Sequence, residues 1–361
     1  MTITMTDPSA CCIGGVDTHK DVHVAAVIDG LGRILGTESF TVDASGYRKL
    51  LAWLRSFGEL TAVGVEGCGS YGAGLARHLM AERVDTVEVN RPNRQRRRRR
   101  GKSDTVDAEA AARAVLAGDS VCVPKTTDGP VECIRVLRVA RRGARKAREQ
   151  AGNQFHTLID TAPEQLRAEL RSGTVKARIV KASRFRPGRP TDPRRATRLA
   201  LASVARRWVA LDAEITALDS ELDLLVAQTA PELVARHGIG TDTAGALLVA
   251  AGDNPERLDD DSGFAALCGT SPVEASSGKI VRHRLNRGGN REANSALWRI
   301  VIVRLSNDQR TQDYMARRIA EGKTKREVLR CLKRYVAREV YNHLPDTISR
   351  EAPNVAVLAA A

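Results

Sequence analysis

The sequence is poor in aromatic residues and contains no long apolar run. Phenylalanine, tryptophan and tyrosine make up only 4% of the 361 residues, so we do not expect a nucleic-acid surface built on base stacking. No segment has the length and apolarity of a membrane-spanning helix, and no signal-peptide pattern is visible. These absences predict a cytoplasmic protein that neither crosses a membrane nor is exported.

The cysteines lack the spacing of a metal site or a disulfide framework. Seven are present, but no two form a Cys-x-x-Cys pair and no histidine-rich segment accompanies them. Zinc binding is therefore not indicated, and reduced thiols fit a cytoplasmic protein best. The length allows two domains joined by a helical connector.

Positive charge is in excess. The chain has 57 lysines and arginines against 43 acidic residues, which gives a net charge of +14. This balance favours a polyanionic partner, most often nucleic acid, over a protein that is merely basic. The basic residues are also clustered, and we expect the cluster to bind phosphates. It consists of Arg96, Arg97, Arg98, Arg99, Arg100 and Lys102.

The first third of the chain has the pattern of a mixed α/β sheet. Alternating or continuous apolar runs predict strands, and apolar residues three and four apart predict helices. The strands are expected at 12–17, 22–28, 33–40, 61–66 and 85–89, and the helices at 47–54, 71–81 and 104–116. A Gly67–Gly72 segment matches the dinucleotide-binding pattern G-x-G-x-x-G. Three strands precede it, however, and a nucleotide site there would leave the clustered acids unexplained.

Four acidic residues are predicted to meet at one edge of this sheet. Asp17 and Glu66 each end a strand, and binding sites lie at the carboxyl ends of parallel strands. Asp104 and Asp107 are three residues apart, so they share one face of a first helical turn. Such a set can hold two divalent metals for phosphodiester chemistry, and oxygen ligands favour Mg²⁺. The alternative is that Asp104 only caps the helix.

The middle of the chain is basic and helical. Residues 131–158 have helical apolar spacing, and a second helix carries a heptad seam from Val204 to Leu225. The two helices would form either an antiparallel hairpin or an oligomer interface, and the sequence leaves both open. Between them, Arg184–Pro190 is predicted to be an exposed basic loop, with an ordinary connector as the alternative.

The last third is predicted to be mostly helical and contains two further candidate sites. His237–Leu248 has the pattern of a helix-hairpin-helix, in which the Gly238 and Gly240 turn would meet a phosphate backbone. The alternative is a plain helix start. Ser277 precedes Gly278, and nearby basic residues would stabilise an attacked phosphate if this serine were a nucleophile; these are Lys279, Arg284 and Arg287. Ser-Gly pairs are also common in turns.

Taken together, these segments resemble the DEDD transposases of bacterial insertion sequences. The resemblance covers residues 12–343 and rests on the following motifs in this order: Gly15–Lys20, Val65-Glu66, Lys102–Ala108, His237–Gly240, and Gly269–Pro272 through Ser277–Lys279 to Arg287–Asn290. Family members combine an N-terminal domain like that of the Holliday-junction resolvase RuvC with a C-terminal domain that carries a serine. They use a bridge RNA to choose donor and target DNA.

The resemblance implies a fold and a division into domains. It implies a RuvC/RNase H-like mixed sheet at 12–120, a basic coiled-coil linker at 130–229 and a mostly α domain at 230–344 with the helix-hairpin-helix-like element. A loose tail would follow at 345–361. The protein would be a nucleoid-associated dimer that pairs into a tetramer.

The resemblance also implies the chemistry. Asp17, Glu66, Asp104 and Asp107 would be the catalytic, Mg²⁺-binding acids. Ser277 would attack a DNA phosphate, with Ser276 as a one-residue ambiguity. The acid site of one protomer would work beside the serine of another, and a structured guide RNA would select the DNA. The alternatives are a metal-dependent junction resolvase or nuclease with a structural serine, and a nucleic-acid scaffold without catalysis.

Overall fold

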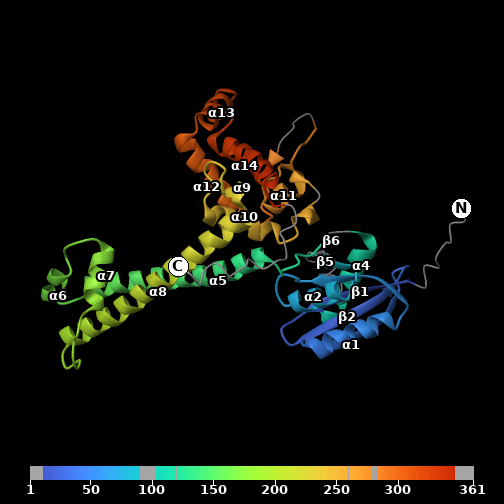
Figure 1. Cartoon of the computed structure of the whole chain (residues 1–361), viewed down its shortest axis with the longest axis horizontal. Coiled ribbons are helices and arrows are strands. Elements are labelled where there is room, and N and C mark those ends of the chain that lie inside the picture. Colours follow the sequence, from blue (N-terminus) through green and yellow to red (C-terminus); the bar gives the residue numbers. More distant parts are fainter. Residues whose placement is uncertain (1–10, 90–102, 119–120, 259, 279–282, 346–361) are drawn as a thin grey trace, which may run out of the picture. The chain divides into compact units, whose positions relative to one another are not determined.

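The computed structural model describes residues 11–89, 103–118, 121–258, 260–278 and 283–345. The chain divides into two compact units (Figure 1). The first comprises Met1–Asp128 and Gly252–Asp259, and the second Gly129–Ala251 and Asp260–Ala361. The predicted domain boundaries differ from these and stay a prediction. The arginine run and Lys102, Lys279, and all but residue 345 of the expected tail lie outside the described residues.

The first unit is built on a mixed sheet, as the sequence predicts. Its described strands are β1 (Cys11–Thr18), β2 (Val22–Asp29), β3 (Ile34–Thr41), β4 (Glu59–Glu66), β5 (Thr86–Val89) and β6 (Val121–Cys122). Their order is β3-β2-β1-β4-β5-β6. Strands β1, β4 and β5 are parallel, while β2, β3 and β6 are antiparallel to their neighbours. The two-residue β6 was not predicted.

Helices cover both faces of this sheet. On one face, α1 (Ala44–Arg55) and α2 (Ala73–Ala81) contribute apolar side chains such as Leu50, Leu54 and Leu79 to a core with Val16 and Val65. On the other face, α4 (Asp104–Ala117) packs through Ala108 and Ala112. Successive residues of a strand face opposite sides of the sheet. Ile13 of β1 therefore packs with α4, and Gly15 and Asp17 follow it on the same face.

Two glycines allow α4 to lie very close to the sheet. A Cβ atom on Gly15 would lie 2.2 Å from the backbone nitrogen of Ala112 and 2.3 Å from the carbonyl oxygen of Ala108. A Cβ on Gly64 of β4 would lie 2.6 Å from Val115 Cγ2. Since real side chains do not tolerate such distances, both positions require glycine. The backbone of α4 therefore rests directly on β1 and β4.

A short segment that lies far along the chain completes the first unit. Gly252–Asp259, which includes the 3₁₀ turn Pro255–Leu258, belongs to this unit rather than to the helices around it. The buried side chain of Asn254 donates from Nδ2 to the carbonyl of Pro124, 3.0 Å away, and accepts from the Thr126 amide at 3.2 Å. These bonds satisfy backbone groups that would otherwise be buried without partners.

The second unit begins with an antiparallel helical hairpin (Figure 1). Helix α5 (Pro130–Asp160) lies along α8 (Pro193–Thr229). Arg141 pairs with Asp219 and Arg148 with Asp212, so residue numbers fall on one helix as they rise on the other. Of the two arrangements that the sequence left open, the antiparallel hairpin is thus present within one chain. The short helices α6 (Glu164–Glu169) and α7 (Val175–Ser183), which were not predicted, pack against its far end.

The rest of the second unit is mostly helical, as predicted. It contains α9 (Pro231–Val234), α10 (Thr241–Ala251), α11 (Asp261–Leu267), α12 (Arg291–Asn307), α13 (Gln309–Ala320) and α14 (Lys325–Tyr341), with the small ladder β7 (Val273–Glu274) and β8 (His283–Arg284). No helix among the described residues combines the length and apolarity that a membrane crossing needs.

One acidic residue joins α10 to the hairpin and to α12. Asp242, in the first turn of α10, accepts hydrogen bonds from Arg138 at 3.0 Å, Arg141 at 2.9 Å and Arg299 at 2.5 Å. Burial would raise the pKa of this carboxyl, but the three arginines lower the pKa to about 2. Asp242 is therefore ionised at neutral pH and fixes three helices to one another.

Candidate active site

The strand acids lie next to each other because β1 and β4 are parallel neighbours. Val16 is the partner of Val65 in the ladder, so Asp17 and Glu66 follow at the same edge. The Thr18 hydroxyl donates to the carbonyl of Glu66 at 2.7 Å and ties the two strand ends together. Both acidic residues are on the face that α4 covers. Asp17 is two residues after Gly15 and Glu66 is two residues after Gly64, and α4 packs against both glycines.

The helix acids are placed by the start of α4. Ser103, not Asp104, is the N-cap: its side chain accepts a hydrogen bond from the amide of Val106. Asp104 and Asp107 are then in the first turn, where the helix dipole favours negative charge. Asp107 is buried, while the Asp104 side chain is 52% exposed. Capping by Asp104 itself is thus not the reason for an acid at this position.

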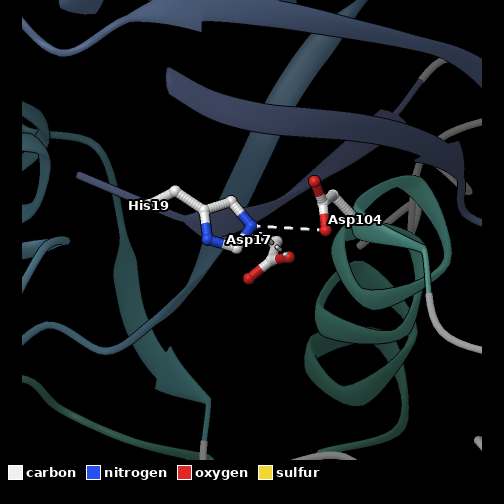
Figure 2. Close-up of side chains that lie close together, drawn as sticks. All are labelled: Asp17, His19 and Asp104. Carbon is white, nitrogen blue, oxygen red and sulfur yellow. Dashed lines mark ion pairs between the residues drawn. The ribbon is translucent and has the colours of Figure 1, made fainter. Parts of the chain in front are cut away.

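A histidine lies between the strand acid and the helix acid. His19 Nε2 is 3.2 Å from Asp17 Oδ2 and 3.3 Å from Asp104 Oδ1 (Figure 2). One ligand atom from each of the three residues falls within 4.8 Å of the others. No role was predicted for His19. Its position two residues after Asp17 was the available signal, because residues two apart in an extended chain share a face.

The electrostatics of this edge show that the acidic residues repel one another. Burial is the main cause that raises the pKa of Asp17, and His19 opposes the rise. The negative charges of Asp107 and Asp104 raise the pKa further. Three carboxylates are therefore close enough to interact. A cation would relieve this repulsion.

The donor set fits a divalent metal ion. Carboxylate oxygens of Asp17 and Asp104 are hard ligands of the kind that Mg²⁺, Mn²⁺ and Ca²⁺ prefer, and imidazole broadens the choice toward other transition metals. Within the described part of the chain, His19 Nε2 is buried and makes no hydrogen bond of good geometry. The three residues can thus hold a metal, with Glu66 and Asp107 adjacent.

The serine lies in a different part of the chain, on an exposed loop of the second unit. Ser277 and Gly278 are exposed and follow β7, and Gly278 adopts a positive φ of 56°. Arg284 and Arg287 are also exposed, while Ser276 is beside Ser277. Ser277 lies between β7 and β8, Arg284 is the last residue of β8, and Arg287 lies between β8 and α12.

The base of this serine loop is firmly held. A Cβ on Gly289 would lie 2.5 Å from the backbone nitrogen of Gly269, so the two ends of the loop touch through their backbones. Asn294 of α12 donates to the carbonyls of Cys268 and Gly269, at 2.8 and 3.2 Å, and accepts from Lys333. The loop thus presents an exposed serine from a fixed base.

The glycine turn before α10 is also well defined. Gly238 has a φ of +77°, and the neighbouring His237 carbonyl accepts from Arg304 Nε at 2.9 Å. The carbonyl of Gly240 accepts from the Ala244 amide and starts α10. A short helix, a glycine turn and a second helix are therefore present at 231–251. A phosphate contact by Gly238 and Gly240 stays a prediction.

The fold and the site together define a class: an α/β domain of the RuvC-like kind, with carboxylates gathered where strand ends meet a helix N-terminus. Comparisons with known proteins identify the family. A family model described as a transposase, of the IS110 type with a DEDD domain, matches residues 14–162. A second, described as the transposase IS116/IS110/IS902 family, matches residues 232–316. The chain belongs to this family of insertion-sequence transposases.

A curated relative agrees with this assignment. The chain is 32% identical over 135 residues to the insertion element IS110 uncharacterized 43.6 kDa protein of Streptomyces coelicolor. The match covers 37% of this chain and 33% of that relative, so it spans about a third of each.

Proposed function

We propose that this protein moves an insertion sequence by cutting DNA strands and rejoining them to new partners. The observation that carries the proposal is the close approach of Asp17, His19 and Asp104 at the edge of the sheet, in a chain that contains both parts of a transposase family. DNA is the substrate, at the element ends and at the target. Action on chromosomal DNA implies a cytoplasmic, nucleoid-associated protein.

The acid cluster would bind Mg²⁺ and act on the phosphodiester. Asp17, Glu66, Asp104 and Asp107 are the proposed ligands, and His19 joins them in this structure. A bound divalent ion would stabilise charge on the attacking and leaving oxygens. The residues themselves orient the phosphate, and the basic segment that contains Arg96–Arg100 and Lys102 would hold the flanking backbone.

The serine is proposed as the nucleophile. The Ser277 oxygen attacks a DNA phosphorus and loses its proton, the bond from phosphorus to one sugar oxygen breaks, and that oxygen leaves as a DNA hydroxyl. A hydroxyl of the new partner strand then attacks the phosphoserine and releases the serine. Lys279, Arg284 and Arg287 would stabilise the charge that develops on the phosphate oxygens.

The remaining parts of the proposal concern partners. A structured guide RNA would select donor and target DNA, and dimers that pair into a tetramer would bring the acid cluster of one protomer beside the serine of another. Family membership and the excess of positive charge support nucleic-acid partners.

A recombination assay with purified protein tests the proposal. It would combine element-end DNA, target DNA and the RNA from the element's non-coding flank, with and without Mg²⁺. Denaturing gels should show a protein–DNA adduct that disappears in Ser277→Ala and persists in Ser276→Ala. Loss in Ser276→Ala alone would move the nucleophile by one residue. Cleaved DNA with no adduct in any variant would instead support metal-dependent hydrolysis with a structural serine.

A further inference from the structure

The tip of the helical hairpin carries most of the net positive charge of the chain. Residues 161–210 contain thirteen lysines and arginines against three acidic residues, while the whole chain has a net charge of +14. The three acids are already paired, because Glu164 binds Arg167 and Arg171, Glu169 binds Arg198, and Asp192 approaches Arg195. Much of the basic charge at the tip thus has no acidic partner within the described residues.

Four of these arginines are exposed and project into solvent. Arg184, Arg186, Arg189 and Arg194 lie on the loop between α7 and α8 and on the first turn of α8. In the part of the chain that the structure describes, their side chains make neither an ion pair nor a hydrogen bond. Mutual repulsion at such a density is tolerated only because water or a polyanion screens it.

The loop that carries them is nevertheless fixed in place. Phe185, between two of the exposed arginines, is buried in the core of the tip, and Arg198 lies over its ring with Cζ 3.9 Å from the centroid. Arg206 donates to the carbonyls of Ser183 and Phe185, at 3.0 and 2.7 Å. Arg206 and the buried ring of Phe185 thus hold the loop backbone in place, while Arg184 and Arg186 on either side of Phe185 are exposed. A fixed loop loses little entropy when it binds.

We propose that the four arginines Arg184, Arg186, Arg189 and Arg194, here called the tip arginines, bind the phosphate backbone of a nucleic-acid duplex. Guanidinium groups suit phosphates because they can donate two parallel hydrogen bonds. A membrane surface would require exposed aromatic or aliphatic side chains beside the charges, but the aromatic residue of this loop is buried. Its burial also removes base stacking, so the contact is independent of sequence.

The length of α8 determines how far this contact lies from the other end of the hairpin. At about 1.5 Å per residue, the 37 residues of α8 span roughly 55 Å. One turn of duplex is about 34 Å. A duplex held by the tip arginines would therefore lie more than one duplex turn away from the other end of α8. The inference rests on the proposed function, because it adds a second anchoring point for the same nucleic acid.

Salt-dependent binding of the full chain tests this contact. Fluorescence anisotropy would measure affinity for a 40-base-pair DNA of arbitrary sequence and for an RNA duplex of equal length, across a range of salt concentrations. Each lost phosphate contact lowers the slope of log affinity against log salt by about 0.9 on DNA. Replacing all four tip arginines with Gln should therefore lower the slope by about 3 to 4. The duplex on which the slope changes identifies the polymer.

A matched pair of variants separates the tip arginines from general charge. Arg186→Gln/Arg189→Gln and Arg167→Gln/Arg171→Gln each remove two charges from the tip, but Arg167 and Arg171 are paired with Glu164. We expect a slope change near 2 for the first pair and below 1 for the second. All variants should unfold at the wild-type temperature. Equal slopes in wild type and the four-residue variant would overturn the inference, whereas a wild-type protein that binds no duplex would overturn the proposed function itself.

Discussion

The backbone of Ala112 lies directly over Gly15, so that the first strand and helix α4 touch without an intervening side chain. A Cβ at position 15 would be 2.2 Å from the Ala112 nitrogen. Asp17 follows two residues after Gly15, and Asp104 and Asp107 precede Ala112 on the same helix. This contact therefore sets the distance between the strand acid and the helix acids. Packing far from solvent therefore determines the geometry of the candidate metal site.

Gly15→Ala is expected to destabilise the protein and to separate the acids. The added methyl group meets backbone atoms rather than a flexible side chain. We therefore expect the free energy of unfolding to fall by about 3 kcal/mol, the upper end of the range typical of overpacking. Denaturant unfolding and Mg²⁺ titration would measure both effects. Gly69→Ala is the matched control, because nothing lies within 4 Å of a Cβ there. A Gly15→Ala protein with normal stability and metal affinity would contradict this account.

The carboxyl of Asp17 should make the metal-free protein less stable as pH rises. Its pKa in the folded state is raised, chiefly by burial and further by Asp107 and Asp104. The unfolded value is about 3.9. A raised pKa favours the folded state at low pH, and this contribution is lost as pH rises through the folded pKa. Asp17→Asn should therefore have a higher unfolding temperature than wild type in EDTA at pH 7. The difference between the two unfolding temperatures should shrink toward pH 4. A lower unfolding temperature for Asp17→Asn than for wild type at pH 7 would refute the prediction.

Divalent metal should reverse this penalty. At ten times its dissociation constant, Mg²⁺ bound only to the folded state would stabilise the wild-type protein by about 1.4 kcal/mol. Asp17→Asn and Asp104→Asn should lose this stabilisation and the recombination activity together. Glu109→Gln removes an acid from the same helix that pairs with Arg113, so it should respond to metal as wild type does. Thermal unfolding with and without Mg²⁺ decides the matter, and an unchanged response in Asp104→Asn would remove that residue from the site.

The Asp242 network should protect the helical unit against acid. Although burial opposes it, the bonds from Arg299, Arg138 and Arg141 lower the pKa to about 2. A depressed carboxyl pKa contributes stability above the unfolded value of about 3.9, and this contribution is lost as pH falls toward 2. The upper bound is about 2–3 kcal/mol, and partial exposure reduces it. Unfolding of Asp242→Asn and wild type should differ at pH 6 and converge near pH 2; a constant difference would exclude this titration.

The strands of the first unit could be predicted because their burial pattern is regular. Val24 to Ile28 form a continuous apolar run, and Val63 and Val65 alternate with residues on the other face. Strand β6 has only two residues, Val121 and Cys122, and depends on pairing with β5. Helices α6 and α7 are short and rich in charge, so local sequence gives little signal for them. Their order comes from tertiary packing around Phe155 and Leu201.

The acid cluster could be predicted in part. Strand-end positions indicated Asp17 and Glu66, and three-residue spacing indicated Asp104 and Asp107. Their approach to one another requires parallel pairing of β1 with β4 and the contact of α4 with Gly15, which are long-range features. His19 was missed because a single histidine after a strand has many ordinary uses.

The return of the chain at Asn254 has a consequence for synthesis. The partners of this side chain, Pro124 and Thr126, are translated about 130 residues earlier. At roughly 5–20 residues per second, the ribosome needs on the order of 6–26 s to make the intervening segment. During that interval the sheet and its acidic residues lack the segment Gly252–Asp259, which completes the first unit. A gene fragment that ends after residue 128 would therefore yield a first unit without Gly252–Asp259 and without the hydrogen bonds of Asn254, even if its strands pair.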